Sequence, residues 1–246
     1  MRRRTRNERR KGVSSDMNRH IAIDGPAGSG KSTVARAVAA KMGLIYVDTG
    51  AMYRAMAVHF VRLGLGASDE AGIAAACESA SVTIGYEAGE QQVYLNGENI
   101  TGLLRAEQTG RMASACSVYA PVRDKMGRLQ KELAAESSVV MDGRDIGTVV
   151  LPDAFLKVYL TASRTVRAGR RYEELRAKGQ RINLTAVEEE MRIRDERDMN
   201  RAIAPLRQAE DALLLDTSGL TPQEATDTIC RLYREKMEKE GAPAWK

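Results

Sequence analysis

The sequence predicts an α/β protein in which helices cover both faces of a parallel β-sheet. Short apolar segments alternate with helical patterns along most of its 246 residues, and strand–helix alternation favours parallel strands joined by crossover helices. Residues 81–100 differ because they combine two strand-like segments with turn residues, a pattern typical of an antiparallel hairpin. We therefore expect a parallel sheet that carries a small antiparallel insertion.

The first part of the chain predicts two strand–helix units and a further helix. HIAID (20–24) is a short apolar strand, and the glycine-rich GPAGSGKST after it leads into a helix. LIYVDTG is a second strand that ends at Asp48, and Thr49 is the expected N-cap of the helix over about 51–63. Residues 70–80 are expected to be helical.

The second part of the chain begins with the insertion and then returns to strand–helix alternation. SVTIGYE and QQVYLNGENI are strands around a turn at 87–90, with Asn96-Gly97 as a second turn signal. A helical pattern covers about 103–136 with a break near Pro121. The elements expected after it are the strands SSVVMDGRD and AFLKVYLTA, a charged helical pair broken near 179–183, the strand ALLLDTS and the helix TPQEATDTICRLYREKME.

Composition excludes several classes of protein. Apolar residues make up 43% of the chain, and its length allows one domain with an insertion or two small domains. No apolar run approaches the ~18–20 residues that cross a bilayer, and no hydrophobic stretch follows the N-terminal charges as in a secretory signal. Three scattered cysteines and two histidines argue against a disulfide framework, a zinc site or a His-based triad. We expect a soluble, cytoplasmic protein.

The net charge of +5 comes from one end of the chain. Residues 1–19 contain eight basic and two acidic side chains, a net of +6, so residues 20–246 carry about −1. A segment with many like charges and few apolar residues is expected to be disordered. Contact with nucleic acid or an anionic membrane is one interpretation. We favour an incidental extension, because charge runs are usually solvated.

The clearest motif follows the first strand. The octapeptide that fits G-x-x-x-x-G-K-[ST] consists of Gly25, Pro26, Ala27, Gly28, Ser29, Gly30, Lys31 and Ser32, with Thr33 next. Glycines allow backbone N–H groups to approach phosphate oxygens, and the helix N-terminus adds partial positive charge. Lys31 can reach the β- and γ-phosphates, and the Ser32 hydroxyl can ligate Mg²⁺. The full spacing between a strand and a helix favours a phosphate loop that binds a nucleoside triphosphate over an ordinary glycine-rich turn.

A phosphate loop alone does not define a function. The chain has no NKxD or TKxD motif that reads guanine, which argues against a GTPase. Asp142, at the end of the apolar strand VVMD, is a candidate second Mg²⁺ ligand, directly or through water. A simple turn at the strand end accounts for this aspartate equally well.

Arginines gather where ligands bind in open α/β sheets. Arg54 and Arg144 follow strand ends, and Arg194, Asp198 and Arg201 share one helical face through their i, i+4 and i+7 spacing. Ion pairs on a solvated surface account for the helix taken by itself. Three clusters at one edge predict a second polyanion that faces the triphosphate. Fixed guanidinium groups relieve the repulsion between two phosphates, as a kinase with a phosphorylated acceptor requires.

The motifs GPAGSGKST, DTGAMYR, DGRDIGTVV and RDERDMNRAIAPL, in this order, resemble those of bacterial cytidylate kinases. The resemblance implies a P-loop nucleoside monophosphate kinase fold, with a five-stranded parallel sheet, and transfer of the γ-phosphate of ATP to CMP or dCMP with Mg²⁺. The implied regions are a basic tail at 1–19, a kinase domain at 20–240 with its core at about 20–75 and 117–240, a monophosphate-binding insertion at about 76–116, a short lid at about 167–182 and a tail at 241–246.

The resemblance also implies roles for single residues. Three side chains would bind the acceptor phosphate: Arg54, Arg144 and Arg201. Thr49, where many members have serine, would be a further substrate-binding residue. Two would meet the sugar hydroxyls: Arg194 and Asp198. Three would face the cytosine: Ser114, Arg123 and Asp145. The lid arginines Arg167, Arg170 and Arg171 would close over the transferring phosphoryl group, and the implied catalytic residues are Lys31, Arg144, Arg167 and Arg171.

Two alternatives stay open. A P-loop kinase for another small acceptor, such as UMP, differs only in the residues that face the base. A nucleotide-dependent RNA-binding factor would use the basic tail, but it leaves the three arginine clusters unexplained. We expect ATP and CMP or dCMP as partners, no membrane, no nucleic acid beyond non-specific contact by the tail, and a monomer.

Overall fold

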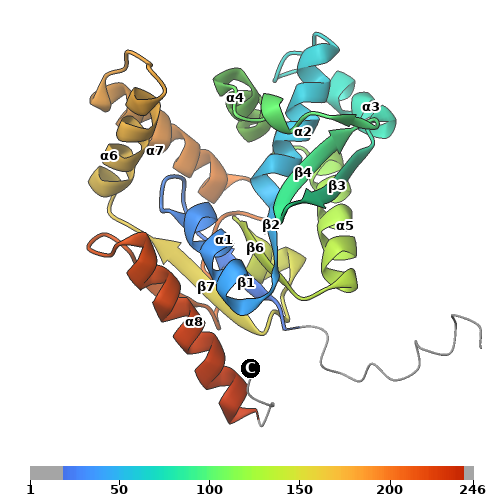
Figure 1. Ribbon diagram of the computed structural model, residues 1–246. Helices are drawn as coiled ribbons and strands as arrows, with labels where there is room; N and C mark the ends of the chain where they lie inside the picture. Colours follow the sequence, from blue (N-terminus) through green and yellow to red (C-terminus); the bar gives the residue numbers. More distant parts are fainter. Residues whose placement is uncertain (1–18, 241–246) are drawn as a thin grey trace, which may run out of the picture.

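A five-stranded parallel sheet lies at the centre of the computed structural model, which describes residues 19–240 (Figure 1). Its strand order is β2-β6-β1-β7-β8, and every neighbouring pair is parallel. The predicted sheet is therefore confirmed. The strand bounds are Ile21–Asp24 (β1), Ile45–Asp48 (β2), Val139–Gly143 (β6), Leu156–Thr161 (β7) and Leu213–Asp216 (β8). The C-terminal tail and most of the basic tail lie outside the described residues.

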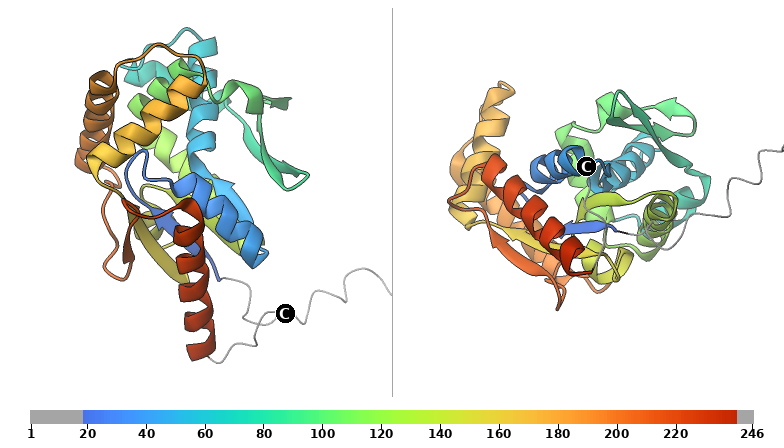
Figure 2. Two further views of the ribbon diagram at one scale, coloured as in Figure 1. Left: turned by 60° about the vertical axis from the view of Figure 1, so that its left-hand side comes forward. Right: turned by 60° about the horizontal axis from the view of Figure 1, so that its bottom comes forward.

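Helices cover both faces of this sheet. Helices α1 and α8 pack together on one face, and α2 and α5 lie on the other with the insertion (Figure 2). Helices α6 and α7 pack against each other near the phosphate loop. The α-helix bounds are Lys31–Met42 (α1), Thr49–Arg62 (α2), Glu70–Ser79 (α3), Glu107–Cys116 (α4), Ala120–Glu136 (α5), Arg164–Ala177 (α6), Leu184–Asn200 (α7) and Pro222–Lys239 (α8).

The short strands are apolar because side chains on both faces are buried. In β1, Ile21 and Ile23 belong to the cluster under α1 and α8, whereas Ala22 belongs to the opposite cluster. This is the alternation with period two that a pleated strand imposes. A parallel sheet covered on both faces thus accounts for the continuous apolar runs in the sequence.

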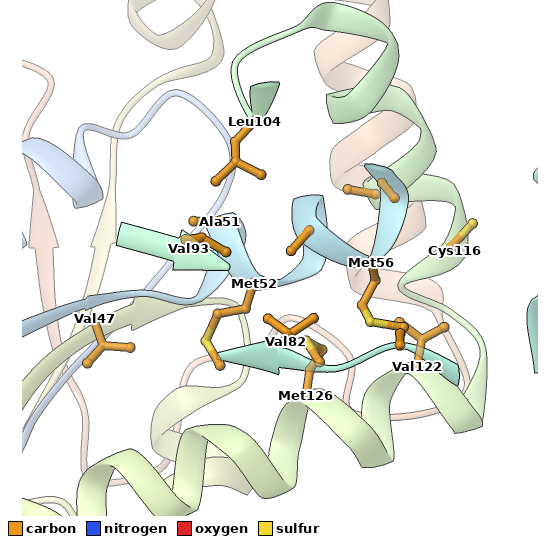
Figure 3. Close-up of a cluster of buried hydrophobic side chains, with 14 of the residues drawn as sticks. Val47, Ala51, Met52, Met56, Val82, Val93, Leu104, Cys116, Val122 and Met126 are labelled. Atoms are coloured by element: carbon orange, nitrogen blue, oxygen red, sulfur yellow. The ribbon is translucent and has the colours of Figure 1, made fainter. Parts of the chain in front are cut away.

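The larger core cluster joins the insertion to the sheet. Figure 3 shows Met52 and Met56 of α2 among side chains from the insertion and from α5, such as Val82 and Met126. All four side chains are buried. At about 25 cal/mol per Å² of buried apolar surface, this shared core stabilises the packing of the insertion against the parallel sheet and its helices.

The insertion contains a separate antiparallel sheet, as the sequence predicted. Its strand order is β3-β4-β5, and the bounds are Val82–Glu87 (β3), Glu90–Leu95 (β4) and Glu98–Asn99 (β5). Ala88 and Gly89 form the first turn with positive φ angles of 50° and 81°, and Asn96 and Gly97 form the second with 51° and 85°. Left-handed conformations at both central positions are typical of tight hairpin turns. A 3₁₀ turn at Thr101–Leu103 follows.

One local prediction needs correction. Helix α2 begins at Thr49, and its N-cap is Asp48, whose carboxylate accepts a hydrogen bond from the Ala51 N–H. The predicted helical break near Pro121 is confirmed, since it falls between Cys116 and Ala120. Pro121 itself lies in the first turn of α5, where a missing N–H costs nothing. The π-helix Ile146–Val150 was not predicted, because a single wide turn leaves no periodic pattern.

Candidate active site

The phosphate loop connects β1 to α1 in a conformation that requires glycine. Gly28 and Gly30 have φ angles of 72° and 92°, and a Cβ atom at Gly25 would lie 2.0 Å from the Leu160 carbonyl oxygen. The Lys31 Nζ donates to the Pro26 carbonyl at 2.7 Å. Burial, together with the nearby Arg144 guanidinium, lowers the pKa of Lys31 well below its usual value. The loop thus holds its lysine in an enclosed, electropositive position.

Ser32 and Asp142, the predicted Mg²⁺ ligands, are in direct contact. The Ser32 hydroxyl donates to one carboxylate oxygen of Asp142 at 2.8 Å, and the Tyr46 hydroxyl donates to the other at 2.9 Å. Burial and the nearby Asp48 carboxylate raise the pKa of Asp142 to about 6. A hydroxyl and a carboxylate are the hard oxygen donors that Mg²⁺ prefers, so this pair fits the ion. Tyr46 was missed, since a tyrosine in a strand gives no functional signal.

Asp24, at the end of β1, holds the segment that carries the DGRD motif. Its two carboxylate oxygens accept hydrogen bonds from the N–H groups of Ile146 and Gly147 at 2.8 and 2.7 Å. The π-helix therefore begins on a buried carboxylate, and Arg144 and Asp145 precede it at fixed positions. Sequence reasoning missed this role, although an aspartate that ends an apolar strand is a usable signal.

Five of the predicted acceptor-binding residues form one network of ion pairs. The Asp145 carboxylate accepts from Arg123 at 2.5 Å and from Arg201 at 3.1 Å. Arg144 donates to Asp198 at 2.8 Å, and Arg201 lies 3.8 Å from the same carboxylate. Burial by itself would raise the pKa of Asp198, but Arg144 and its neighbours lower it below the usual value. The structure thus brings together residues from α5, α7 and the end of β6.

Arg194 and Arg54 lie beside this network with spare hydrogen-bonding capacity. Within residues 19–240, the Arg194 Nε is one of three buried side-chain polar atoms without a hydrogen-bond partner. Burial and the adjacent Arg144 lower the pKa of Arg194 to about 10. Arg54 is 34% exposed in its side chain and lies 3.9 Å from Asp48. Both guanidinium groups are suited to an incoming anion.

Ser114 and Thr49 make contacts that the sequence did not predict. The Ser114 hydroxyl accepts a hydrogen bond from Arg197 of α7 at 3.2 Å, which links α4 to α7. The Thr49 hydroxyl donates to the Asp142 carbonyl at 2.7 Å, so its proton is used within the protein. Arg197 had no predicted role, although its i+3 spacing from Arg194 places it on the same helical face.

The three arginines of the predicted lid are placed differently from one another. Arg167 is 7% exposed, and its guanidinium donates to the Ala162 and Ala27 carbonyl oxygens and to the Asp195 carboxylate. Arg170 donates to the Ser29 and Thr217 carbonyl oxygens. Arg171 is half-exposed, pairs with Glu174 and lies close enough to Arg194 to affect its pKa. The closure of all three over the transferring phosphoryl group stays a prediction.

A parallel sheet whose first strand leads into a phosphate loop, with buried arginines beside that loop, defines the class of P-loop kinases. The family model described as cytidylate kinase matches residues 21–235. The chain belongs to the cytidylate kinase family, whose members are ATP-dependent kinases.

Individual relatives match nearly the whole chain. The chain is 45% identical over 221 residues to a cytidylate kinase of Desulfitobacterium hafniense. This match covers 90% of the chain and 95% of that relative. It is also 45% identical over 221 residues to a cytidylate kinase of Bacillus licheniformis, with 89% and 97% covered. A solved structure of an uncharacterized protein from Eubacterium ventriosum shares the fold, with a TM-score of 0.50, 14% identity and coverage of 89% and 99%. None of the helices within residues 19–240 combines the length and apolar character needed to span a membrane.

Proposed function

We propose that this protein transfers the γ-phosphate of ATP to CMP or dCMP, giving ADP and the corresponding diphosphate. The observation that carries the proposal is the buried cluster of arginines and carboxylates beside the phosphate loop. Arg144 and Arg194 lie near enough to Lys31 to lower its pKa, after the larger effect of burial. Two groups of anion-binding side chains therefore lie next to each other, as transfer between two phosphates requires.

The phosphate loop is the donor site. Its N–H groups and Lys31 would hold the triphosphate, while Ser32 and Asp142 would hold Mg²⁺ directly or through water. When bound, Mg²⁺ neutralises charge that develops on the transferring phosphate. The 2.8 Å contact between the two side chains supports this assignment, because one ion could take both as ligands.

The arginine network is the acceptor site. Arg54, Arg144 and Arg201 would bind the phosphate of CMP, with Thr49 at the edge of this group. Arg194 and Asp198 would meet the sugar. Arg194 has an unused buried donor, and Asp198 remains ionised because its pKa is lowered, so it can accept hydrogen bonds from hydroxyl groups.

Recognition of cytosine would fall to Ser114, Arg123 and Asp145. Cytosine presents an amino donor at N4 and acceptors at N3 and O2. The Asp145 carboxylate is held by Arg123 and Arg201, so it would present acceptors to the amino group while Arg123 would present donors. Uracil reverses this polarity at positions 3 and 4, which would leave buried polar groups unpaired.

No side chain needs to act as a general base, because the acceptor phosphate is already an anion. The protein would position the two phosphates, neutralise their charge and exclude water. We assign the lid to about 167–182 and the monophosphate-binding insertion to about 76–116. Arg171 of the lid would approach the phosphoryl group when the lid closes.

An acceptor panel tests the proposal. The purified protein is incubated with Mg-ATP and, separately, with CMP, dCMP, UMP or AMP, and ADP formation is measured. We expect strong turnover with CMP and dCMP and much weaker turnover with UMP. A preference for UMP would contradict the assigned base contacts, and no turnover with any acceptor would contradict the proposed reaction.

A further inference from the structure

One residue of the phosphate loop, Ala27, is held through both of its backbone polar groups by a buried ion pair. The Ala27 N–H donates to Asp195 of α7 at 3.3 Å, and the Ala27 carbonyl accepts from Arg167 of α6 at 2.9 Å. Arg167 and Asp195 are themselves 2.6 Å apart. The three residues form a closed ring of contacts between the loop and two helices.

Burial makes this ring more than a surface contact. Arg167 and Asp195 are each 7% exposed, and Ala27 is 8% exposed. A carboxylate and a guanidinium at such burial must pair, because an isolated buried charge is very costly. Their remaining hydrogen-bonding groups are directed to the backbone of Ala27 and, for Arg167, also to the Ala162 carbonyl.

Apolar packing at the same place connects the loop to both helices independently. Ala27 belongs to a small buried cluster with Ala168, Leu175, Val187 and Met191 of α6 and α7. A Cβ atom at Gly28 would lie 2.7 Å from Met191 and 3.1 Å from the Arg167 carbonyl oxygen. The start of the loop thus forms part of the interface between these two helices.

We propose that Arg167 and Asp195 are positioning residues that fix the phosphate loop in the shape that binds ATP, an inference that rests on the proposed donor site. The pair acts on the loop through the Ala27 backbone. Asp195 had no predicted role, and Arg167 was expected to contact the phosphoryl group. Its guanidinium makes contacts to Ala162, Ala27 and Asp195, so it stabilises the donor site through the backbone of the phosphate loop.

The first variant is Asp195→Asn, which keeps the size of the side chain. Its amide would turn donor groups toward Arg167 and disrupt the ring. The second is the double variant Arg167→Met with Asp195→Leu, since apolar replacement of a buried ion pair often preserves stability. Glu196→Gln is the matched control, because it makes the same chemical change one residue along α7, where Glu196 pairs only with Arg192 at the surface.

Binding is measured by calorimetry with Mg²⁺ and the non-hydrolysable ATP analogue AMP-PNP, and separately with CMP. Circular dichroism and thermal melting check folding. We expect both ring variants to bind AMP-PNP at least about tenfold more weakly, while CMP affinity and the Glu196→Gln variant stay within about twofold of the unmodified protein.

Three results would overturn the inference. A folded double variant that binds AMP-PNP normally would show that the ring does not shape the loop. Equal losses for AMP-PNP and CMP would indicate a purely structural role. An Arg167→Lys variant with lower kcat and unchanged AMP-PNP affinity would place Arg167 on the transferring phosphoryl group. The AMP-PNP measurement needs no acceptor, so it is independent of whether CMP is the substrate.

Discussion

Charged side chains of the candidate site are buried in complementary sets. Asp145 lies between Arg123 and Arg201, and Asp198 lies between Arg144 and Arg201. Pairing compensates the cost of burying each charge and fixes the guanidinium groups before any ligand arrives. Such preorganised charge is effective in catalysis, because little reorganisation is needed when phosphates meet.

Lys31→Ala and Arg144→Ala should each abolish most phosphoryl transfer while the protein stays folded. Each removes a positive charge from the space between the two proposed phosphate sites, and loss of one such group typically lowers kcat by about 10²–10³-fold. ADP formation with CMP measures the effect, and circular dichroism controls for folding. Turnover near that of the unmodified protein in either variant would show that the site is assigned wrongly.

Asp24 should contribute a distinctive pH dependence to stability. Burial raises the pKa of Asp24 to about 6, above its value in the unfolded chain. As the pH falls, Asp24 therefore takes up a proton at a higher pH in the folded state than in the unfolded chain. Ionised Asp24 destabilises the folded state, and this destabilisation is fully present only above about pH 6. Between pH 7.5 and 5 this cost should decrease by about 1 kcal/mol.

The Asp24→Asn variant isolates this effect, because it cannot titrate. The free energy of unfolding of the unmodified protein, relative to the variant, should rise by about 1 kcal/mol when the pH is lowered from 7.5 to 5. Chemical denaturation at the two values measures it. Titration of other groups cancels in the comparison, so a difference that does not change with pH would refute the burial of an ionised Asp24.

Single residues differed in how far the sequence could predict their place. Arg144, Asp198 and Arg201 could be placed at one site because strand ends and helical spacing carry that information. Asp24 and Asp195 act on backbone groups of distant segments. Such contacts have no local pattern, so sequence spacing could not predict them.

At the scale of elements, the insertion is attached to the kinase core through an edge strand. β2 lies at one edge of the parallel sheet. The Gln91 side chain of β4 accepts from the Asp48 N–H at 2.8 Å and donates to the Asp48 carbonyl at 3.3 Å. The Tyr86 hydroxyl donates to the Tyr46 carbonyl on the same strand. The hairpin therefore supports the strand from which Tyr46 contacts Asp142.

Gln91→Ala should lower the free energy of unfolding by about 1–2 kcal/mol, since two half-buried backbone groups of Asp48 lose their partners. Urea denaturation measures the change. Gln92→Ala is the control, because the Gln92 side chain accepts a hydrogen bond from Asn99 within the insertion, and its effect should stay within about 0.5 kcal/mol. Equal effects of the two variants would contradict the role given to Gln91.

Most elements followed from the sequence because their patterns are local. The strands are short apolar runs, and the hairpin turns carry Ala88-Gly89 and Asn96-Gly97 at left-handed positions. The start of α2 was misplaced because both Asp48 and Thr49 can cap a helix, and only the tertiary contact between Thr49 and Asp142 decides between them. The π-helix depends on Asp24, which is distant in sequence.

At the scale of the whole molecule, both proposed sites meet on α7. Its Arg194 and Asp198 belong to the proposed acceptor site, whereas Asp195 contacts the phosphate loop. Different faces of α7 thus contact the proposed acceptor site and the phosphate loop, so movement of this helix would affect both sites. This arrangement suits an enzyme that must bring two nucleotides together and exclude water before transfer.

The central claim is that phosphate passes directly from ATP to CMP at this site. Its most direct test is to incubate the protein with Mg²⁺, CMP and ATP labelled in the γ-phosphate, and to separate the products by chromatography. The label should appear in CDP, with little in inorganic phosphate, and should remain in ATP with the Lys31→Ala variant. Label released mainly as inorganic phosphate would indicate hydrolysis and would contradict the account.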